Sequence, residues 1–295
     1  MPRVRTIARM ILDRRGSPLA PADKPRPESW SSDEITGSCL GHSTVLLNVF
    51  GVRILTDPVF STRVGLGFQP LVLGPKRFLK PALRPRDFAA PDLILLSHAH
   101  FDHFDVASLR KFSRDTPIVT ARHTGDLLRC WRFRDIVELD WGEDVSVTTR
   151  AGAVRIKAIE VAHWGARLIR DAHRGYNGYV IEREGASLCF AGDTAYTRAF
   201  SRLNNSRRPL DLMLMPIGAY NPWIRAHCSP EQAVEMARQA GARYFVPIHH
   251  ETFQLSDEPM DEPAARLRAA FAHDPERLLA VNVGETFRVP QKMAA

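Results

Sequence analysis

The stretch Ser97-His98-Ala99-His100-Phe101-Asp102-His103 places four side chains that can bind a metal ion within six residues. The segment before it, 92–96, is short and apolar after its first residue, which is typical of a strand buried on both faces. If the backbone stays extended, the first two histidines point the same way and can hold one ion, while the turn beyond directs the aspartate and the third histidine toward a second. We therefore predict a metal site where this strand ends, the position at which α/β sheets collect ligands.

Further short motifs occur at the ends of other predicted strands. They are Gly41-His42-Ser43-Thr44, Thr56-Asp57-Pro58, Ala162-His163-Trp164, Ala191-Gly192-Asp193-Thr194 and Pro247-Ile248-His249. In this order around the His-x-His-x-Asp-His sequence, they make the chain similar to the metallo-β-lactamase fold superfamily from about residue 37 to residue 286. The resemblance implies an α/β fold of the α+β kind, in which two sheets covered by helices form an αββα sandwich.

Within that superfamily the chain resembles the branch that contains N-acyl-phosphatidylethanolamine-hydrolysing phospholipase D. The segments behind this match are Gly74-Pro75-Lys76-Arg77-Phe78, Glu138-Leu139-Asp140-Trp141, Ala191-Gly192-Asp193-Thr194-Ala195-Tyr196 and Pro216-Ile217-Gly218-Ala219-Tyr220. Three departures from the mammalian enzyme surround the substrate: Phe101 replaces a tyrosine, Ala226 a glutamine, and His250-Glu251 a Trp-Gly pair. They bear on the substrate and leave the metal motifs intact.

The resemblance implies a complete set of metal ligands. One ion would be held by His98, His100 and His163, a second by Asp102, His103 and His249, and Asp193 would be shared. This nitrogen-rich set suits two catalytic Zn²⁺ ions, with iron or manganese as alternatives because ligand type does not fix the metal. A hydroxide bridging the ions would attack a phosphodiester phosphorus or an ester carbonyl.

Two of the side chains are predicted to act on the substrate. Asp102 would orient the hydroxide and pass its proton to the leaving group, and His227 would contact the phosphate or protonate the leaving oxygen. Asp57 would either support the metal loop or simply form the turn before Pro58, and both readings remain open. Family position also places His42 near the site. The other histidines are expected in supporting or surface positions: His123, His173, His250 and His273.

These motifs favour a zinc-dependent hydrolase, a phospholipase D-like phosphodiesterase acting on a phospholipid or small-molecule substrate. The enzymatic alternative is a lactonase or other carboxylic-ester hydrolase. The non-enzymatic alternative is an inactive metal-binding protein associated with a membrane. No nucleic-acid partner is expected, because the chain lacks a basic and aromatic surface motif of that kind. The pattern does not predict an oligomeric state.

Composition indicates one large domain, 34–295, preceded by an amphipathic and proline-rich arm, 1–33. The 295 residues are 44% hydrophobic and carry a net charge of +7. The basic amphipathic segment 1–15 would either contact an anionic membrane surface or pack on the domain. Four cysteines without a CxxC pair suggest reduced thiols, and we expect a cytoplasmic protein, with peripheral contact to the inner membrane surface as an option. No apolar run is long enough for a transmembrane helix.

Apolar alternation and turn residues predict the remaining elements. Strands are expected at 43–50, 52–56, 117–120, 136–139, 145–149, 154–161, 177–182, 187–191, 210–216 and 244–248, and near 279 and 287. Helices are expected at 105–112, 124–131, 229–241 and 262–272, the third beginning at the N-cap Ser229. Segment 60–88 is rich in Gly and Pro, and we interpret it as a loop that either forms a wall of the site or caps the core.

Overall fold

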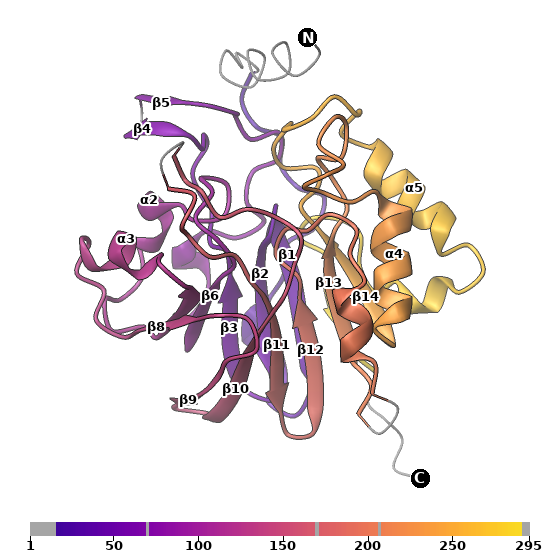
Figure 1. The fold of residues 1–295 in the computed structure, drawn as a ribbon, viewed down its shortest axis with the longest axis horizontal. Helices are drawn as coiled ribbons and strands as arrows, with labels where there is room; N and C mark the ends of the chain where they lie inside the picture. The colour runs from indigo at the N-terminus through magenta and orange to yellow at the C-terminus, as the bar shows by residue number, and fades with distance from the viewer. Residues whose placement is uncertain (1–15, 69–70, 169–170, 206–207, 291–295) are drawn as a thin grey trace.

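The computed structural model describes residues 16–68, 71–168, 171–205 and 208–290. Over these residues two β-sheets pack face to face, with helices on their outer sides (Figure 1). The arrangement is the αββα sandwich that the sequence motifs imply. The short strands of the first sheet and the hairpins of the second meet the outer helices through separate apolar clusters.

The first sheet has the strand order β15-β1-β2-β3-β6-β7-β8. Its strands are β1 (Ile35–Gly41), β2 (Thr44–Val49), β3 (Val52–Thr56), β6 (Leu93–Leu96), β7 (Ile118–Ala121), β8 (Ile136–Leu139) and β15 (Thr286–Arg288). The pairs from β15 to β3 are antiparallel, and those from β3 to β8 are parallel. All four residues of β6 are buried, as expected for a parallel strand covered on both faces.

The second sheet has the order β14-β13-β12-β11-β10-β9. Its strands are β9 (Asp144–Thr149), β10 (Gly152–Ile159), β11 (Gly178–Arg183), β12 (Ala186–Phe190), β13 (Leu212–Pro216) and β14 (Tyr244–Ile248). Strands β9 to β12 pair antiparallel, whereas β12, β13 and β14 pair in parallel. Strands β10, β12 and β14 therefore run in the same direction, and the loops that follow them leave from one edge of the sheet.

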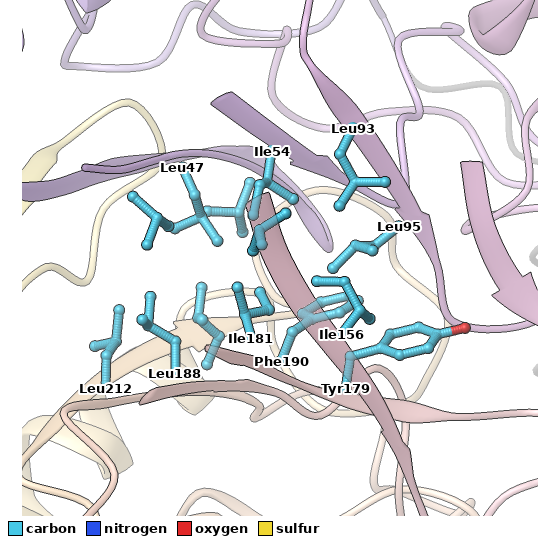
Figure 2. Packing of buried hydrophobic residues seen from close by; sticks show 14 of the residues in the cluster. Leu47, Ile54, Leu93, Leu95, Ile156, Tyr179, Ile181, Leu188, Phe190 and Leu212 are labelled. Atoms are coloured by element: carbon cyan, nitrogen blue, oxygen red, sulfur yellow. The ribbon is translucent and has the colours of Figure 1, made fainter. Parts of the chain in front are cut away.

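The core lies between the two sheets. Figure 2 shows Leu47, Ile54, Leu93 and Leu95 of the first sheet facing side chains of the second. Those opposing side chains are Ile156, Tyr179, Ile181, Leu188, Phe190 and Leu212. The Tyr179 hydroxyl donates a hydrogen bond of 2.9 Å to the carbonyl oxygen of Leu96, so the buried phenol is satisfied across the sheets. This packing fixes the strand ends from which the site is built.

Helices cover both outer faces. The described helices are α2 (Val106–Leu109), α3 (Gly125–Arg129), α4 (Pro230–Gln239) and α5 (Glu262–Ala270), with the 3₁₀ turns η1 (Pro27–Ser29), η2 (Pro85–Asp87), η3 (Ala199–Leu203) and η4 (Pro275–Arg277). Helices α2 and α3 pack on the first sheet, and α4 and α5 pack on the second (Figure 1). The Ser229 side chain accepts from the backbone of Gln232 and the Gln232 side chain reaches back, forming the capping box that starts α4.

Most of the predicted strands and helices are present with shifted ends, but three expectations were wrong or incomplete. Strand β1 was not predicted. The segment near residue 279 is no strand and contributes a single bridge between Leu278 and Phe245. Segment 60–88 contains a two-stranded antiparallel sheet formed by β4 (Leu66–Phe68) and β5 (Leu71–Leu73). The glycines of this segment are typical of loops, so the strands were not predicted. Glycine is needed at position 67 because a Cβ there would lie 2.3 Å from the Leu71 carbonyl oxygen.

The proline-rich part of the predicted arm is tied to the domain by backbone hydrogen bonds. The amide of Leu19 donates to the carbonyl of Phe78 (2.9 Å), and the amide of Lys80 donates to the carbonyl of Leu19 (2.7 Å). The predicted amphipathic helix, 1–15, lies outside the described residues, and the boundary between residues 33 and 34 stays a prediction. In the described ranges no helix has the length and apolar character needed to cross a bilayer. All four cysteines are free.

The packing between the sheets predicts a large stability difference between two leucines. Leu95 is fully buried, whereas Leu71 is 84% exposed. Leu95→Ala should lower the free energy of unfolding by about 2–5 kcal/mol, because the cavity cannot collapse between two sheets. Leu71→Ala, the matched control, should change it by no more than about 0.5 kcal/mol. Urea unfolding measures both values, and similar losses in the two variants would contradict the packing described.

Candidate metal centre

Four strand ends deliver the predicted ligands to one place. The loop after β6 carries the His-x-His-x-Asp-His stretch, and the loops after β10, β12 and β14 carry His163, Asp193 and His249. Gly192 adopts a φ of +61°, and a Cβ there would lie 2.7 Å from Cβ of Ser97. Glycine is therefore required for the turn after β12 to approach the loop after β6 of the opposite sheet.

Asp193 lies at the centre of the cluster. Its side chain is 1% exposed. Oxygen Oδ2 lies 3.1 Å from Nε2 of His103 and 3.2 Å from Nε2 of His249. Three more imidazole nitrogens surround the same oxygen: Nε2 of His163 at 3.7 Å, Nδ1 of His227 at 3.8 Å and Nε2 of His98 at 4.0 Å. One carboxylate oxygen is thus shared among ligand atoms from both predicted metal positions.

The remaining ligand atoms divide into two groups around this carboxylate. Nδ1 of His100 lies 2.8 Å from Nε2 of His98 and 3.2 Å from Nε2 of His163. In the other group, Oδ2 of Asp102 lies 3.7 Å from Nε2 of both His103 and His249. The structure therefore brings all seven predicted ligands together. Overlapping groups that could hold an ion include His98, His100 and His163, then Asp102, His103 and His249 with His42, and also His98 and His103 with Asp193. Ligation itself remains a prediction.

Two further histidines join the cluster. Nε2 of His42 lies 3.0 Å from Oδ2 of Asp102, and the His42 side chain is 1% exposed. His227 lies with its ring centroid 5.1 Å from those of His163 and His249. Three histidines expected outside the site lie apart from the cluster. The ring centroids of His123 and His173 are 5.8 Å from each other, and His273 is exposed. His250 is buried directly after His249 in the chain.

Asp57 fixes the orientation of two ligand histidines at once. Its carboxylate accepts from the backbone N–H of Ser97 (2.7 Å), from the Ser97 hydroxyl (2.6 Å) and from Nδ1–H of His103 (2.7 Å). Since the Ser97 hydroxyl has donated its proton, it accepts from Nδ1–H of His98 at 2.9 Å. In its neutral form each imidazole then carries its lone pair on Nε2, the atom that faces Asp193. The carboxylate does more than form the turn before Pro58.

His163 is oriented in the same way from another element. Its Nδ1–H donates to the carbonyl oxygen of Ala226 at 2.8 Å, which leaves the Nε2 lone pair facing His100. The indole of Trp164 stacks on the His163 ring at 4.7 Å and remains 47% exposed. The motifs did not predict that Ser97, Ala226 or Trp164 would orient the ligand side chains. Only the position of Ser97 directly before the first histidine offered a signal, because carbonyl partners and ring stacking depend on the tertiary fold.

The electrostatics favour a positive charge between these side chains. Burial alone would raise the pKa of the Asp193 carboxyl, but the imidazoles of His103 and His249 hold it well below its usual range. Burial alone would lower the pKa of His103, but the carboxylates of Asp193 and Asp102 raise it well above its ordinary value. A proton or a metal ion supplies such a charge.

The buried polar atoms of the cluster fit metal ions. Among the described residues, no hydrogen-bond partner satisfies Nε2 of His103, Nδ1 of His227, Oδ1 of Asp193 or either ring nitrogen of His249. Each such buried group costs about 1–3 kcal/mol if it stays unpaired. Imidazole nitrogens with two carboxylates form a donor set suited to zinc, and the outer partners of three histidines leave lone pairs pointing inward.

A largely apolar cavity of about 450 Å³ adjoins the metal loop. Phe101, between two of the proposed ligands, lines it, together with residues of the β4–β5 hairpin, α2 and α3 such as Val64, Val72, Val106 and Leu127. The guanidinium of Arg167 lies 4.0 Å from the centre of the Phe101 ring and donates to the carbonyls of Ala99 and Phe104. None of the seven proposed ligands lines this cavity, so it extends away from the metal centre.

The chain is similar to proteins of the β-lactamase superfamily. The model of the β-lactamase superfamily domain matches residues 52–250. An uncharacterized protein of Mycobacterium tuberculosis is 32% identical over 272 residues, covering 90% of this chain and 71% of that protein. The N-acyl-phosphatidylethanolamine-hydrolyzing phospholipase D 1 of Caenorhabditis elegans is 27% identical over 280 residues, covering 89% of this chain and 78% of that enzyme.

A solved structure agrees with the fold. A metallo hydrolase of the archaeon Ignicoccus hospitalis superposes with a TM-score of 0.64 at 20% identity, covering 88% of this chain and 99% of that one. At this level of sequence identity, the superposition supports the fold and nothing further.

The hydrogen bonds of Asp57 predict that it governs metal affinity from outside the ligand set. In Asp57→Asn, an amide N–H₂ would face a group that donates a hydrogen bond, and both His98 and His103 would lose their orientation. Zinc affinity, measured by competition with a chromophoric chelator, should fall by roughly 10–100-fold. Asp140→Asn is the control, because Asp140 is an exposed carboxylate paired with Arg122. Equal affinities in both variants would reduce Asp57 to a turn residue.

Proposed function

Because the chain belongs to the β-lactamase superfamily and is a metal-dependent hydrolase of that fold, we propose that it is a two-zinc phosphodiesterase of the phospholipase D type. The observation that carries the proposal is the position of Asp193 Oδ2 among five imidazole nitrogens, four of them from the two ligand groups and one from His227. A single ion would leave the buried ligand atoms of one of the two groups without a cation. Two ions with a shared carboxylate satisfy both.

The seven side chains would divide the metals as the motifs imply. His98, His100 and His163 would hold one ion, Asp102, His103 and His249 the other, and Asp193 would contact both. When bound, two such ions supply the Lewis-acid charge that neutralises a phosphodiester and makes water acidic enough to attack near neutral pH. Iron or manganese in place of zinc would change this ligand set little.

Asp102 is the carboxylate that can act on the substrate. Its side chain is 16% exposed, against 1% for Asp193. Burial alone would raise the pKa of Asp102. The neighbouring histidines, among which His103 has the largest effect, hold this pKa well below its usual range. An ionised carboxylate at the open side of the cluster can accept a proton from the attacking water and pass it to the leaving oxygen.

His227 would contact the phosphoryl group. It belongs to the loop between β13 and α4, and its side chain is 10% exposed, next to Asp193. Burial lowers the pKa of His227 well below its ordinary value, so the free protein holds this imidazole neutral. A neutral ring donates one N–H hydrogen bond, which would go to a phosphoryl oxygen or the leaving oxygen.

The apolar cavity supports a substrate with a hydrocarbon part. A phosphodiester held at the metal centre would pass Phe101 before its apolar portion enters the cavity of about 450 Å³. Arg167 on the Phe101 ring adds a cation near the same passage. The similarity to the C. elegans phospholipase D favours an N-acyl-phosphatidylethanolamine-like substrate. A cytoplasmic location and membrane contact through residues 1–15 stay predictions.

Zinc-loaded protein should hydrolyse bis-p-nitrophenyl phosphate and N-acyl-phosphatidylethanolamine, and removal of the metal with a chelator should abolish both activities. Added zinc should restore them, because the ligand cluster is built into the folded chain. The same preparation is also tested on acyl lactones. Comparing product formation on the three substrates distinguishes a phosphodiesterase from a carboxylic-ester hydrolase. Turnover of lactones alone would contradict the phosphodiesterase proposal in favour of a carboxylic-ester hydrolase.

A variant of Asp102 sharpens the same experiment. Asp102→Asn should retain most of its zinc but lose roughly 10²–10⁴-fold in kcat, since the amide cannot take up a proton. Asp115→Asn is the control, because Asp115 is an exposed carboxylate paired with Arg134. Undiminished turnover in Asp102→Asn would remove Asp102 from the proposed chemistry.

A further inference from the structure

The β4–β5 hairpin presents an apolar outer face. Leu66 of β4 lies opposite Leu73 of β5, so these side chains share one face of the two-stranded sheet. Leu71 lies two residues before Leu73 and therefore points to the same side. The three side chains are 56%, 65% and 84% exposed for Leu66, Leu73 and Leu71. Val72, between them in sequence, points to the opposite side and is 8% exposed.

This pattern reverses what a surface hairpin ordinarily shows. A strand with one solvated face places polar side chains on that face, whereas here leucines occupy it. Among the described residues, Leu71 is the most exposed large apolar side chain. Figure 1 shows β4 and β5 projecting away from the two sheets, so no strand of either sheet covers them. Exposed apolar groups gathered at one place mark an interaction surface.

The hairpin lines the cavity that adjoins the metal loop. Val64, Leu66 and Val72 line the same cavity as Phe101, whose neighbours in sequence are the proposed ligands His100 and Asp102. A partner bound to the outer face of the hairpin would therefore lie close to the cavity that is proposed to take the apolar part of the substrate. Val72 faces this cavity, Leu66 borders both the cavity and the surroundings, and Leu71 and Leu73 face the surroundings.

The base of the hairpin is basic. The backbones of Arg63 and Lys76 form an isolated antiparallel β-bridge there. A wider cavity of about 940 Å³ begins at the adjoining Thr62, and five basic side chains line it against two acidic ones. The basic residues are Lys24, Lys80, Arg84, Arg86 and Lys111, and the acidic residues are Asp23 and Asp87. The excess of positive charge matches an anionic partner and opposes a second copy of this chain, which would bring like charges together.

We propose that the outer face of the β4–β5 hairpin docks on an anionic lipid bilayer. Leu66, Leu71 and Leu73 enter the boundary between headgroups and acyl chains, and the basic residues around the hairpin base contact lipid phosphates. The inference rests on the proposed function, because a phospholipid substrate must be taken from a bilayer. It assigns the membrane contact to a described element distinct from residues 1–15.

Co-sedimentation of the full chain with phosphatidylcholine vesicles, with and without phosphatidylserine, tests the proposal. The wild-type chain should bind the anionic vesicles more tightly, and binding should weaken as salt is added. Leu71→Asp should weaken binding by roughly tenfold or more, because a charge replaces a leucine that would be buried in the bilayer. Ala151→Asp makes the same charge change at the exposed turn between β9 and β10 and should bind as the wild type does.

The outcomes separate docking from catalysis. Thermal unfolding and hydrolysis of soluble bis-p-nitrophenyl phosphate should be the same for Leu71→Asp and the wild type. Equal vesicle binding by these two chains would overturn the docking proposal even if both hydrolyse the soluble diester. Self-association of the wild type that Leu71→Asp abolishes, without vesicle binding, would overturn it in favour of a second copy. Loss of vesicle binding in Leu71→Asp alone would support it even if no phosphodiester is hydrolysed.

Discussion

The burial of the Asp193 carboxylate is the constraint on which the site depends. An ionised carboxylate taken out of water is stable only when cations or hydrogen-bond donors surround it. Here the groups closest to its Oδ2 are imidazole nitrogens, and the outer hydrogen bonds of His98, His103 and His163 turn lone pairs toward it. Lone pairs and a carboxylate facing one another repel unless positive charge lies between them. The cluster therefore favours positive charge at its centre, from protons or from metal ions.

The arrangement of the two sheets explains how the chain brings the proposed ligands together. Strands β10, β12 and β14 run in one direction within the second sheet, so the loops carrying His163, Asp193 and His249 emerge together. The loop after β6 of the first sheet meets them across the interface, where Gly192 permits a close approach to Ser97. Asp57, at the end of β3, holds this loop through Ser97 and His103. Core packing between the sheets thus sets the distances among the ligands.

The local motifs could be predicted because each depends on a short pattern. An apolar run before His98 and a glycine before Asp193 indicate strand ends, and the sandwich is implied by the resemblance of the whole set of motifs to the metallo-β-lactamase fold. The partners of those residues could not be predicted in the same way. The link between Asp57 and both His98 and His103 depends on β3 lying beside β6, and the Ala226 carbonyl reaches His163 from a distant loop. The β4–β5 hairpin escaped prediction because its glycines and prolines are typical of loops.

Zinc-loaded crystals measured at the zinc absorption edge test the central claim most directly, because anomalous difference density locates each ion independently of the protein. The account predicts two ions per chain, one among His98, His100 and His163 and the other among Asp102, His103 and His249, with Asp193 in contact with both. Density for one ion only, or for two ions neither of which contacts Asp193, would contradict it.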